Sequence, residues 1–353
     1  MLSLCEGIGA MKAMVLREAA DVGKSPMELE ELPAPEPGPD QVRVRVHVCG
    51  VCRTDLHVVE GDLPPGKRPV IPGHEVVGTV DQVGRDVRTV KAGDRVGIAW
   101  LQGTCRRCEY CVSGQENLCE EGRFTGYHVD GGYAEYAVVR AEFAYPIPSA
   151  FTDEEAAPLL CAGIIGYRAL RLSGVKPGQT LGLYGFGASA HMTIQVARHW
   201  GCRVFVFSLR EEHRVLAREL GAAWVGSALD APPEKLHGAI LFAPAGELVP
   251  PALRALRKGG TLALAGIHMT PIPTLDYHHD LYGERTIRSV TANTKQDGLD
   301  LLQEAAAIPI RPHTRRFRLE EANQALQELK AGAFTGAAIL EVTPSLSSKS
   351  ARG

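Results

Sequence analysis

Four cysteines lie close together in the first half of the chain, and their spacing restricts the fold more than any other feature does. They follow the pattern C-x2-C-x2-C-x7-C and are Cys105, Cys108, Cys111 and Cys119. Four thiolates this close together repel one another unless a cation lies between them, and a tetrahedral zinc ion accepts four sulfur ligands. Such a site leaves no open coordination position, so we predict a structural zinc that folds and fixes the loop.

Two other interpretations of this loop stay open at this point. The four thiols could be unligated, or they could hold an iron–sulfur cluster, since the spacing partly resembles ferredoxin cysteine runs. The chain has nine cysteines in all. In a reducing compartment they are not expected to form structural disulfides, which favours metal ligation or burial as small apolar side chains.

The length and composition indicate a globular enzyme of two domains. The 353 residues exceed what one hydrophobic core usually serves. The net charge is only −3, so we expect no nucleic acid and no membrane among the partners. No apolar run approaches the ~20 residues of a membrane span, and residues 1–10 do not resemble a secretory signal. We therefore predict a cytoplasmic protein.

The pattern of apolar residues changes near Thr152. Before it, the alternation at 41–48 and a Gly- and Pro-rich stretch at 72–97 predict a mainly β region. After it, Thr152 is a predicted cap for an Ala-rich helix. Strands and helices then alternate at 180–184, 188–200, 203–207, 211–220, 239–242, 253–257 and 261–265. This alternation predicts a doubly wound parallel sheet.

We therefore expect an α/β protein with two domains. Residues 161–294 are predicted to form a dinucleotide-binding Rossmann domain. Residues 11–160 and 295–345 are predicted to form a mainly β catalytic domain, the second range contributing a helix at 319–330 and a strand at 337–342. Residues 1–10 and 346–353 are expected to be flexible termini.

A second set of metal-ligand residues is spread over three short segments. Cys52 opens the segment C-R-T-D-L-H, His74 lies in G-H-E, and Cys161 lies in L-C-A-G. Each residue alone is weak evidence, because a lone cysteine is usually inert and a lone histidine is usually satisfied by its surroundings. Together, two thiolates and one imidazole are the ligand set of a catalytic zinc that keeps its fourth position for water or substrate.

These motifs together resemble the zinc-containing alcohol dehydrogenases of the medium-chain dehydrogenase/reductase family, and most closely the yeast and bacterial ethanol-type branch. The likeness runs over residues 11–342. It implies a GroES-like catalytic domain, a homodimer or homotetramer, and two zinc ions per chain, the catalytic one held by Cys52, His74 and Cys161. It also implies that Glu75 lies behind the metal and that Asp55 orients the His74 ring.

A zinc ion with two thiolate ligands creates a need for a proton route. The thiolates cancel its charge, so it is a milder Lewis acid than a zinc bound by three imidazoles, although it still lowers the pKa of a bound hydroxyl. Thr54 can hydrogen-bond the alcohol oxygen, and His57 can pass the proton on, since an imidazole titrates near neutral pH. The alternative for Thr54 is a hydroxyl that only bonds backbone at the end of a strand, and the alternative for His57 is an ordinary surface histidine.

A glycine-rich turn between a strand and a helix predicts the dinucleotide site. The segment is L-G-L-Y-G-F-G-A-S-A from Leu181, and its candidate cofactor-binding residues are Gly185, Gly187, Ala188 and Ser189. Small residues at a helix N-terminus let backbone N–H groups reach a pyrophosphate. The motif alone is weak, but its position before a helix, with a second strand about twenty residues later, strengthens it.

The end of that second strand favours NADP over NAD. Where NAD-preferring relatives carry an aspartate, this chain has Ser208, followed by Arg210 and Arg214, which could bind a 2′-phosphate. The alternative is a solvated Arg210 and NAD bound without the usual acid. Near residue 336, relatives carry an arginine that this chain lacks, so Arg53 is expected to contact the pyrophosphate instead.

Residues that match the substrate pocket of the family suggest a wide cavity. Trp100 and Leu101 match its wall, and Val59 and Leu63 stand where yeast-type enzymes carry tryptophan. The predicted reaction is hydride transfer between a primary or small secondary alcohol, or its aldehyde or ketone, and NAD(P). The alternatives are a zinc-dependent reductase of a cinnamyl-type aldehyde or a polyol, and a cofactor sensor without turnover. A zinc-free quinone reductase would have no use for the metal ligands.

Overall fold

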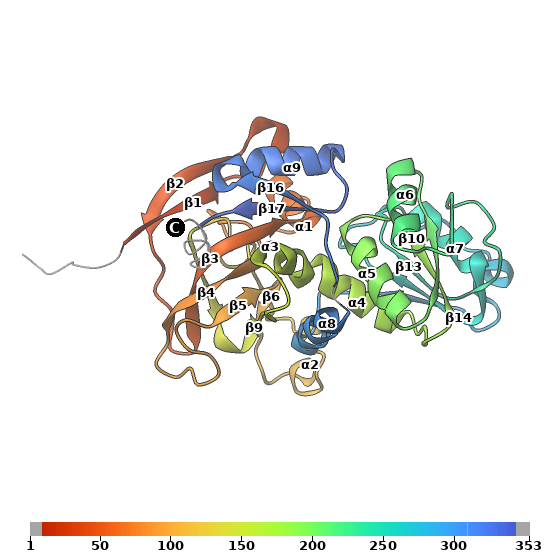
Figure 1. Cartoon of the computed structure of the whole chain (residues 1–353), viewed down its shortest axis with the longest axis horizontal. Coiled ribbons are helices and arrows are strands. Elements are labelled where there is room, and N and C mark those ends of the chain that lie inside the picture. The colour runs from red at the N-terminus through yellow and green to blue at the C-terminus, as the bar shows by residue number, and fades with distance from the viewer. Residues whose placement is uncertain (1–8, 309, 344–353) are drawn as a thin grey trace, which may run out of the picture. The chain divides into compact units, whose positions relative to one another are not determined.

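The chain divides into two compact units. A computed structural model describes residues 9–308 and 310–343. The first unit runs to Cys161 and resumes at Thr314, and the second contains Ala162 to His313. The colours of Figure 1 follow this order, with red, orange and dark blue in the first unit and green and cyan in the second. The predicted flexible termini fall almost entirely outside the described residues, and β1 already begins at Ala10.

The first unit is built on a mainly antiparallel sheet with the order β16-β17-β3-β4-β5-β9, in which β8 also pairs with β3. The strands of this sheet are β3 (Gln41–Val51), β4 (Glu75–Val83), β5 (Arg95–Ile98), β8 (Tyr136–Arg140), β9 (Ala144–Pro146), β16 (Thr314–Arg318) and β17 (Ala337–Glu341). Along the first half of β3 the valines are buried and the residues between them are partly exposed. The strand predicted at 41–48 is thus confirmed, because its alternation matches a sheet with one face on the core.

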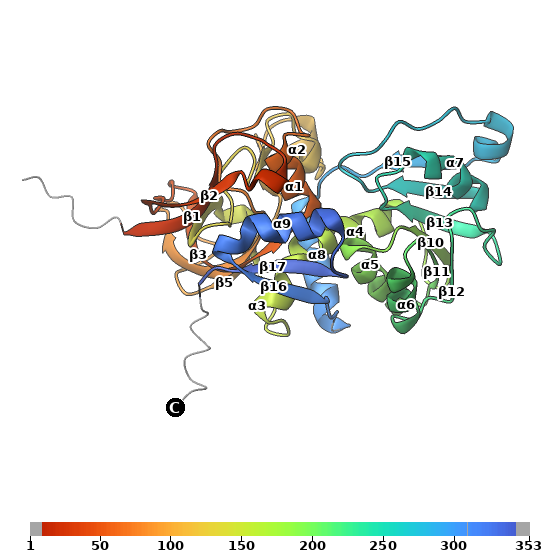
Figure 2. The same cartoon turned by 90° about the horizontal axis from the view of Figure 1, so that it is seen from above.

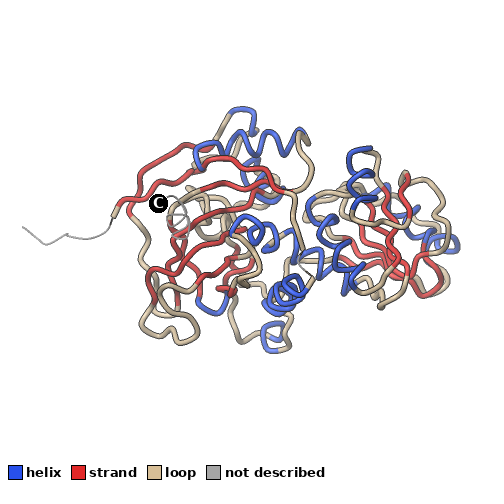
Figure 3. The backbone as a smooth tube through the Cα atoms, in the orientation of Figure 1, coloured by secondary structure: helices blue, strands red, loops and turns tan. Residues whose placement is uncertain are grey.

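Shorter elements complete the first unit. Its remaining strands are β1 (Ala10–Leu16), β2 (Met27–Pro33), β6 (Leu101–Gly103) and β7 (Arg123–Phe124), and its helices are α1 (Arg53–Glu60), α2 (Glu109–Val112), α3 (Asp153–Ala156) and α9 (Ala322–Ala331). Strands predominate in this unit, as the red segments of Figure 3 show. Thr152 caps α3 as predicted, since its hydroxyl accepts the N–H of Glu155.

The second unit is a doubly wound parallel sheet with the order β12-β11-β10-β13-β14-β15. Its strands are β10 (Thr180–Tyr184), β11 (Arg203–Phe207), β12 (Trp224–Gly226), β13 (Leu236–Leu241), β14 (Leu256–Leu264) and β15 (Thr286–Ser289). Its helices are α4 (Ala162–Leu172), α5 (Ala188–His199), α6 (Glu211–Glu219), α7 (Val249–Ala255) and α8 (Lys295–Ala307). Figure 2 shows the strands following one another in this order, and Figure 1 shows α5 and α7 on opposite faces. The predicted fold is confirmed.

Two local predictions differ from the structure. The helix predicted at 253–257 lies earlier, as α7, because Pro250 and Pro251 occupy its first turn and β14 already begins at Leu256. The chain returns to the first unit at Thr314, whereas the sequence suggested residue 295. Residues 295–307 instead form α8, a helix of the second unit. No helix within the described residues is long and apolar enough to cross a membrane.

A buried aspartate ties α8 to α4 and explains why this helix belongs to the second unit. Thr294 caps α8, and its hydroxyl and N–H both donate to the Asp297 carboxylate. The same carboxylate accepts hydrogen bonds from Arg168 at 2.5 Å and from Arg171 at 2.9 Å, both on α4. Because Asp297 is 1% exposed, water cannot replace these partners.

We expect Asp297→Ala to lower the free energy of unfolding of the second unit by about 3 kcal/mol, because it leaves a buried guanidinium unpaired and removes half of the cap. The shift of the thermal midpoint measures this loss. Asp300→Ala is the matched control, since that residue is partly exposed and contacts Arg171 at 3.5 Å, and it should cost less than about 1 kcal/mol. Equal shifts in the two variants would contradict the role given to Asp297.

Candidate metal centres and active site

The start of α1 places two of the predicted site residues side by side. β3 ends at Val51, and Cys52 is the extended residue at the N-cap of the helix. Its N–H donates to the Asp55 carboxylate at 2.9 Å. Helices commonly begin with such a reciprocal contact between the cap and the third helical residue. The chain thus holds the Cys52 thiol at the end of a strand, with Asp55 directed back beneath it.

The other oxygen of Asp55 fixes the orientation of His74. It accepts a hydrogen bond from His74 Nδ1 at 2.7 Å and one from the Gly73 N–H at 3.2 Å. A carboxylate only accepts, so Nδ1 carries the proton and Nε2 carries the lone pair. His74 is 0% exposed, and its Nε2 has no hydrogen-bond partner in the structure. A buried, unpaired imidazole nitrogen is what a metal ligand presents in the absence of its ion.

Cys161 and Glu75 complete this group. The Sγ atoms of Cys52 and Cys161 are 3.7 Å apart, and one ligand atom from each of Cys52, His74, Glu75 and Cys161 lies within 4.8 Å of the others. The three predicted zinc ligands therefore converge, although they come from three separate segments. Two sulfurs and one imidazole nitrogen fit a zinc ion, with room for a fourth ligand that is not a sulfur.

The acid–base state of this group favours a cation. The hydrogen bond from Cys161 holds the pKa of the Cys52 thiol well below its ordinary value. Burial raises the pKa of the Glu75 carboxyl well above its ordinary value. Glu75 is held closely against Gly50, because a methyl group at Gly50 would lie 1.8 Å from its carboxylate oxygen. Burial of these acidic groups side by side is costly unless a positive charge joins them.

The four clustered cysteines also converge, as predicted. One sulfur from each of Cys105, Cys108, Cys111 and Cys119 lies within 4.8 Å of the others. Backbone N–H groups of Arg107 and Cys108 lower the pKa of Cys105 to about 6, whereas the neighbouring sulfurs contribute to a raised pKa of Cys108 and burial raises that of Cys119. Without a cation, the four sulfurs therefore do not all ionise together. The loop contains α2 and a short 3-10 turn, Glu116–Leu118, with no long element to support it. Four sulfur ligands around one ion would make this a closed, structural type of site.

The two predicted relay residues lie on α1, beyond the metal ligand. Thr54 is buried, at 8% exposure. His57 lies one turn further along the helix, and its Nδ1 pairs with the Asp62 carboxylate at 2.8 Å. Asp62 is not among the residues predicted from the sequence. The signal was present, since an acid follows the Gly61 that ends the helix, but only the three-dimensional turn brings it onto the imidazole.

Trp100 packs directly against His74, a predicted zinc ligand. The two rings meet edge to face with centroids 5.0 Å apart. Phe124 and Tyr127 stack on the indole at 5.1 and 5.9 Å, so the Trp100 ring is held in one orientation. Of the other predicted pocket residues, Val59 and Leu101 are fully buried, and Leu63 is partly exposed.

The glycine-rich turn of the second unit has the geometry that a pyrophosphate requires. β10 ends at Tyr184, Gly185 takes φ 88°, and Gly187 caps α5. A methyl group at Gly187 would meet no heavy atom within 4 Å, so the helix N-terminus is open on that side. Ala188 and Ser189 form the first turn of α5, whose free N–H groups can bind an anion.

Basic side chains surround the end of β11. Arg214 Nε donates to the Ser208 carbonyl oxygen at 2.7 Å, and the N–H of Arg210 donates to the Ser208 hydroxyl at 3.4 Å. His213, which the sequence analysis missed, places Nδ1 3.4 Å from the same hydroxyl. Burial and the charge of Arg210 lower the pKa of His213. The predicted Arg53 is the first residue of α1 in the other unit.

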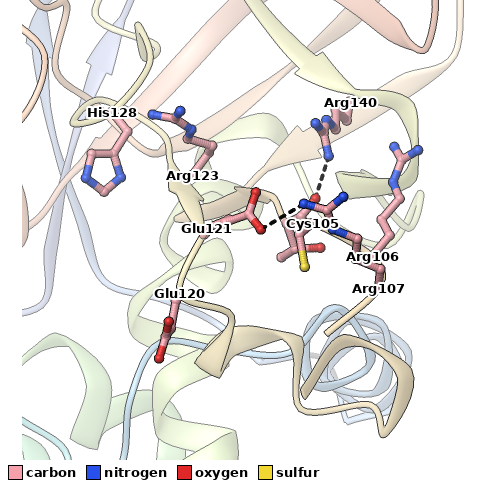
Figure 4. A pocket seen from close by; sticks show the side chains of 10 residues that line it. Cys105, Arg106, Arg107, Glu120, Glu121, Arg123, His128 and Arg140 are labelled. Carbon is pink, nitrogen blue, oxygen red and sulfur yellow. Dashed lines mark hydrogen bonds and ion pairs between the residues drawn. The ribbon is translucent and has the colours of Figure 1, made fainter. Parts of the chain in front are cut away.

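A further hollow of about 680 Å³ lies beside the cysteine loop and is distinct from the centre at Cys52. It is rich in arginine, as Figure 4 shows, with Arg140 bonded to the Thr104 carbonyl and Arg107 paired with Glu121. Arg106 is paired with Asp40 and Glu142, outside the lining. Neighbouring carboxylates thus already neutralise the charges of Arg106 and Arg107.

A closed cysteine site, an open site of two sulfurs and an imidazole, and a parallel sheet with a glycine-rich turn together define a metal-dependent dehydrogenase. Comparison with known proteins agrees. Residues 38–149 match the family description "Alcohol dehydrogenase GroES-like domain", and residues 190–307 match "Zinc-binding dehydrogenase".

Individual relatives lead to the same family. The chain is 51% identical to "Probable alcohol dehydrogenase AdhA" of Mycobacterium tuberculosis, over 94% of this chain and 97% of that protein. Among solved structures it resembles a cinnamyl alcohol dehydrogenase of Sorghum bicolor (TM-score 0.85, 28% identity, 94% and 98% of the two chains). It also resembles a cobalt- and zinc-bound thermostable alcohol dehydrogenase of Pyrobaculum aerophilum, with a TM-score of 0.85 and 26% identity over 95% of this chain and 100% of that chain.

The chain belongs to the zinc-type alcohol dehydrogenases of the medium-chain dehydrogenase/reductase family, as its motifs indicated. It is an oxidoreductase that transfers a hydride between an alcohol and a nicotinamide dinucleotide.

We expect Asp55→Asn to weaken zinc binding at the Cys52–His74–Cys161 centre about 10- to 100-fold, because an amide has no negative charge and only one acceptor oxygen for the N–H groups of Cys52, Gly73 and His74. The rate of zinc loss to a chelator measures the effect. Tyr133→Phe is the control, since it removes a single 3.3 Å hydrogen bond to the same carboxylate. If both variants lost zinc at the same rate, the orientation of His74 by Asp55 would not be what holds the metal.

Proposed function

We propose that the enzyme binds two zinc ions per chain and divides their roles between catalysis and folding. The four-cysteine group supports the folding role, because its four sulfur ligands leave no position for substrate. The group of Cys52, His74 and Cys161 supports the catalytic role, because its fourth neighbour is the Glu75 carboxylate and not a further sulfur, and an alcohol or aldehyde oxygen could replace that carboxylate on the metal. The unpaired Nε2 of His74 is the observation on which this assignment depends.

When bound, the catalytic zinc supplies Lewis acidity that favours the alkoxide of the substrate. Thr54 accepts the proton of the alcohol hydroxyl and passes on its own, and His57 takes it up. A bound nicotinamide dinucleotide would supply the hydride acceptor for the substrate carbon, and His57 would release the proton to water. The sum is alcohol plus oxidised cofactor giving aldehyde or ketone, reduced cofactor and one proton.

Glu75 and Trp100 have supporting roles in this proposal. Glu75 lies within reach of the metal and offsets its charge, as its burial beside the two thiols suggests. Trp100 provides an aromatic wall beside the metal, because its ring is held against His74. With valine and leucine at positions 59 and 63, we expect longer and aromatic alcohols to be accepted as well as ethanol.

The enzyme acts, in this proposal, as a homodimer or homotetramer in the cytoplasm. The edge strand β15 offers unpaired backbone groups, and the segment before it exposes Ile267, Ile272, Tyr277 and Tyr282. A second copy of the chain would cover such an edge. None of the eight cysteines of the described ranges forms a disulfide, which suits a reducing compartment.

Metal content and stability distinguish the two zinc sites. Purified wild type should contain two zinc ions per chain. Cys52→Ser should contain one and lose activity while its thermal midpoint changes little, whereas Cys108→Ser should lower the midpoint, since a closed site contributes folding free energy. Elemental analysis, a turnover assay and thermal unfolding test this. One zinc per chain in the wild type, or a stable Cys108→Ser protein, would contradict the division of roles.

The cofactor is NADP in this proposal, bound with its 2′-phosphate at Ser208, Arg210 and Arg214. Ser208 itself carries no charge that would repel a phosphate, and its hydroxyl can bind one. Arg210 and Arg214 pair with Glu212 and Glu211, each at 3.4 Å, and a 2′-phosphate would compete with these exposed acids for the guanidinium groups. His213 adds a further nitrogen to the same place.

Kinetics with NADH and NADPH across a panel of aldehydes test the cofactor assignment. Ser208→Asp should lower kcat/KM for NADPH about 10- to 100-fold and leave NADH equal or better, because a carboxylate repels the 2′-phosphate. Arg210→Ala should lower kcat/KM for NADPH and leave kcat/KM for NADH unchanged. Arg218→Ala is the control, since that residue lies on the same helix and pairs with Glu211. A wild type that prefers NADH would overturn the assignment.

A further inference from the structure

Asp62 is joined to His57 twice, through its side chain and through its backbone. Its carboxylate lies 2.8 Å from His57 Nδ1. Its N–H donates to the His57 carbonyl oxygen at 3.0 Å, as does the N–H of Gly61. Gly61, with φ 80°, ends α1 in the left-handed conformation that turns the chain back on the helix. The contact is therefore fixed by the end of the helix and does not depend on two mobile side chains meeting.

The other acids on α1 have partners of their own. On the same helix, Asp55 is occupied by Cys52, Gly73 and His74. Glu60 accepts from the Val22 N–H and from Lys330 Nζ, which also binds Asp21 on the neighbouring turn.

The exposure of the two side chains differs in a useful way. That of His57 is 16% exposed and that of Asp62 is 45% exposed. The imidazole is thus largely enclosed, and the carboxylate that meets it lies towards water. The negative charge that faces the imidazole therefore stays hydrated and does not have to be buried.

The contact determines which nitrogen of His57 can accept a proton. A carboxylate only accepts hydrogen bonds, so Nδ1 carries the hydrogen and Nε2 carries the lone pair. After Nε2 takes up a proton, the negative charge of Asp62 stabilises the imidazolium. The pair of Asp55 and His74 uses the same chemistry, which leaves Nε2 of His74 available to a metal. Each of the two carboxylate–imidazole pairs thus has one member on α1, Asp55 in one pair and His57 in the other.

We propose that Asp62 is a positioning residue of the proton route, which acts by fixing the tautomer of His57 and stabilising its protonated form. This inference rests on the relay role proposed above for His57. The proton of the alcohol reaches Nε2 through Thr54 and then passes to water, the hydride goes to the nicotinamide, and the Asp62 carboxylate stays ionised throughout.

A double-mutant cycle on the zinc-loaded enzyme tests the proposal. In alcohol oxidation, Asp62→Asn should lower kcat about 10- to 100-fold with KM, zinc content and thermal midpoint nearly unchanged. Imidazole added to the buffer should restore part of the rate, since it supplies an external proton acceptor. The double variant with His57→Gln should be no more than about twofold slower than His57→Gln alone, because the two side chains act as one unit.

The control is Glu60→Gln, which removes an acid from the same helix end without touching His57. It should keep the wild-type kcat. Multiplicative losses in the double variant, or the same loss and rescue in Glu60→Gln, would overturn the proposal for Asp62. A His57→Gln variant as active as wild type would instead overturn the relay role of His57 and the proposal with it. Wild type without hydride transfer would refute the enzymatic function itself.

Discussion

The active site depends on the hydrogen bonds that one buried carboxylate accepts. Asp55 is 1% exposed and receives the N–H groups of Cys52 and Gly73, the Nδ1–H of His74 and, at a longer distance, the hydroxyl of Tyr133. These donors come from different parts of the first unit. By accepting from all of them, Asp55 joins the start of α1 to the segment before β4 and sets the direction of the imidazole. Without it, the two metal ligands nearest in sequence would have no fixed relation.

The two cysteine-containing centres are built in opposite ways. The ligands of the closed site lie within fifteen residues of one another, so the loop can fold around its ion with little help from the rest of the chain. Those of the open site stand at the end of β3, before β4 and after a 3-10 turn, 157–160. These residues converge only when the sheet has formed. Rigid strands can keep the ligands in place without a fourth protein ligand, which a flexible loop cannot do as well.

The sequence allowed much of this to be predicted, for physical reasons. The cysteine loop is a local pattern, and the strands of the second unit are short apolar runs separated by helices, so both are legible without a structure. The metal ligands of the open site needed the family resemblance to be joined. α8 was not predicted, although Thr294 and Asp297 have the spacing of a capping box, because the alternation of strand and helix patterns is weak after residue 294. His213 and Asp62 were missed because each meets its partner across a turn.

The two places where the chain passes between the units have a consequence for its synthesis. The second unit is one continuous stretch, from Ala162 to His313, and all of its strands are present once that stretch has been made. In the first unit, β17 lies inside the sheet and pairs with β3. The backbone groups on that edge of β3 therefore have no strand partner until β17 has been synthesised. A chain emerging from the ribosome can thus complete its later half first and must keep its earlier half from aggregating meanwhile. Removal of β17 would therefore leave one edge of β3, a strand made much earlier, without a partner.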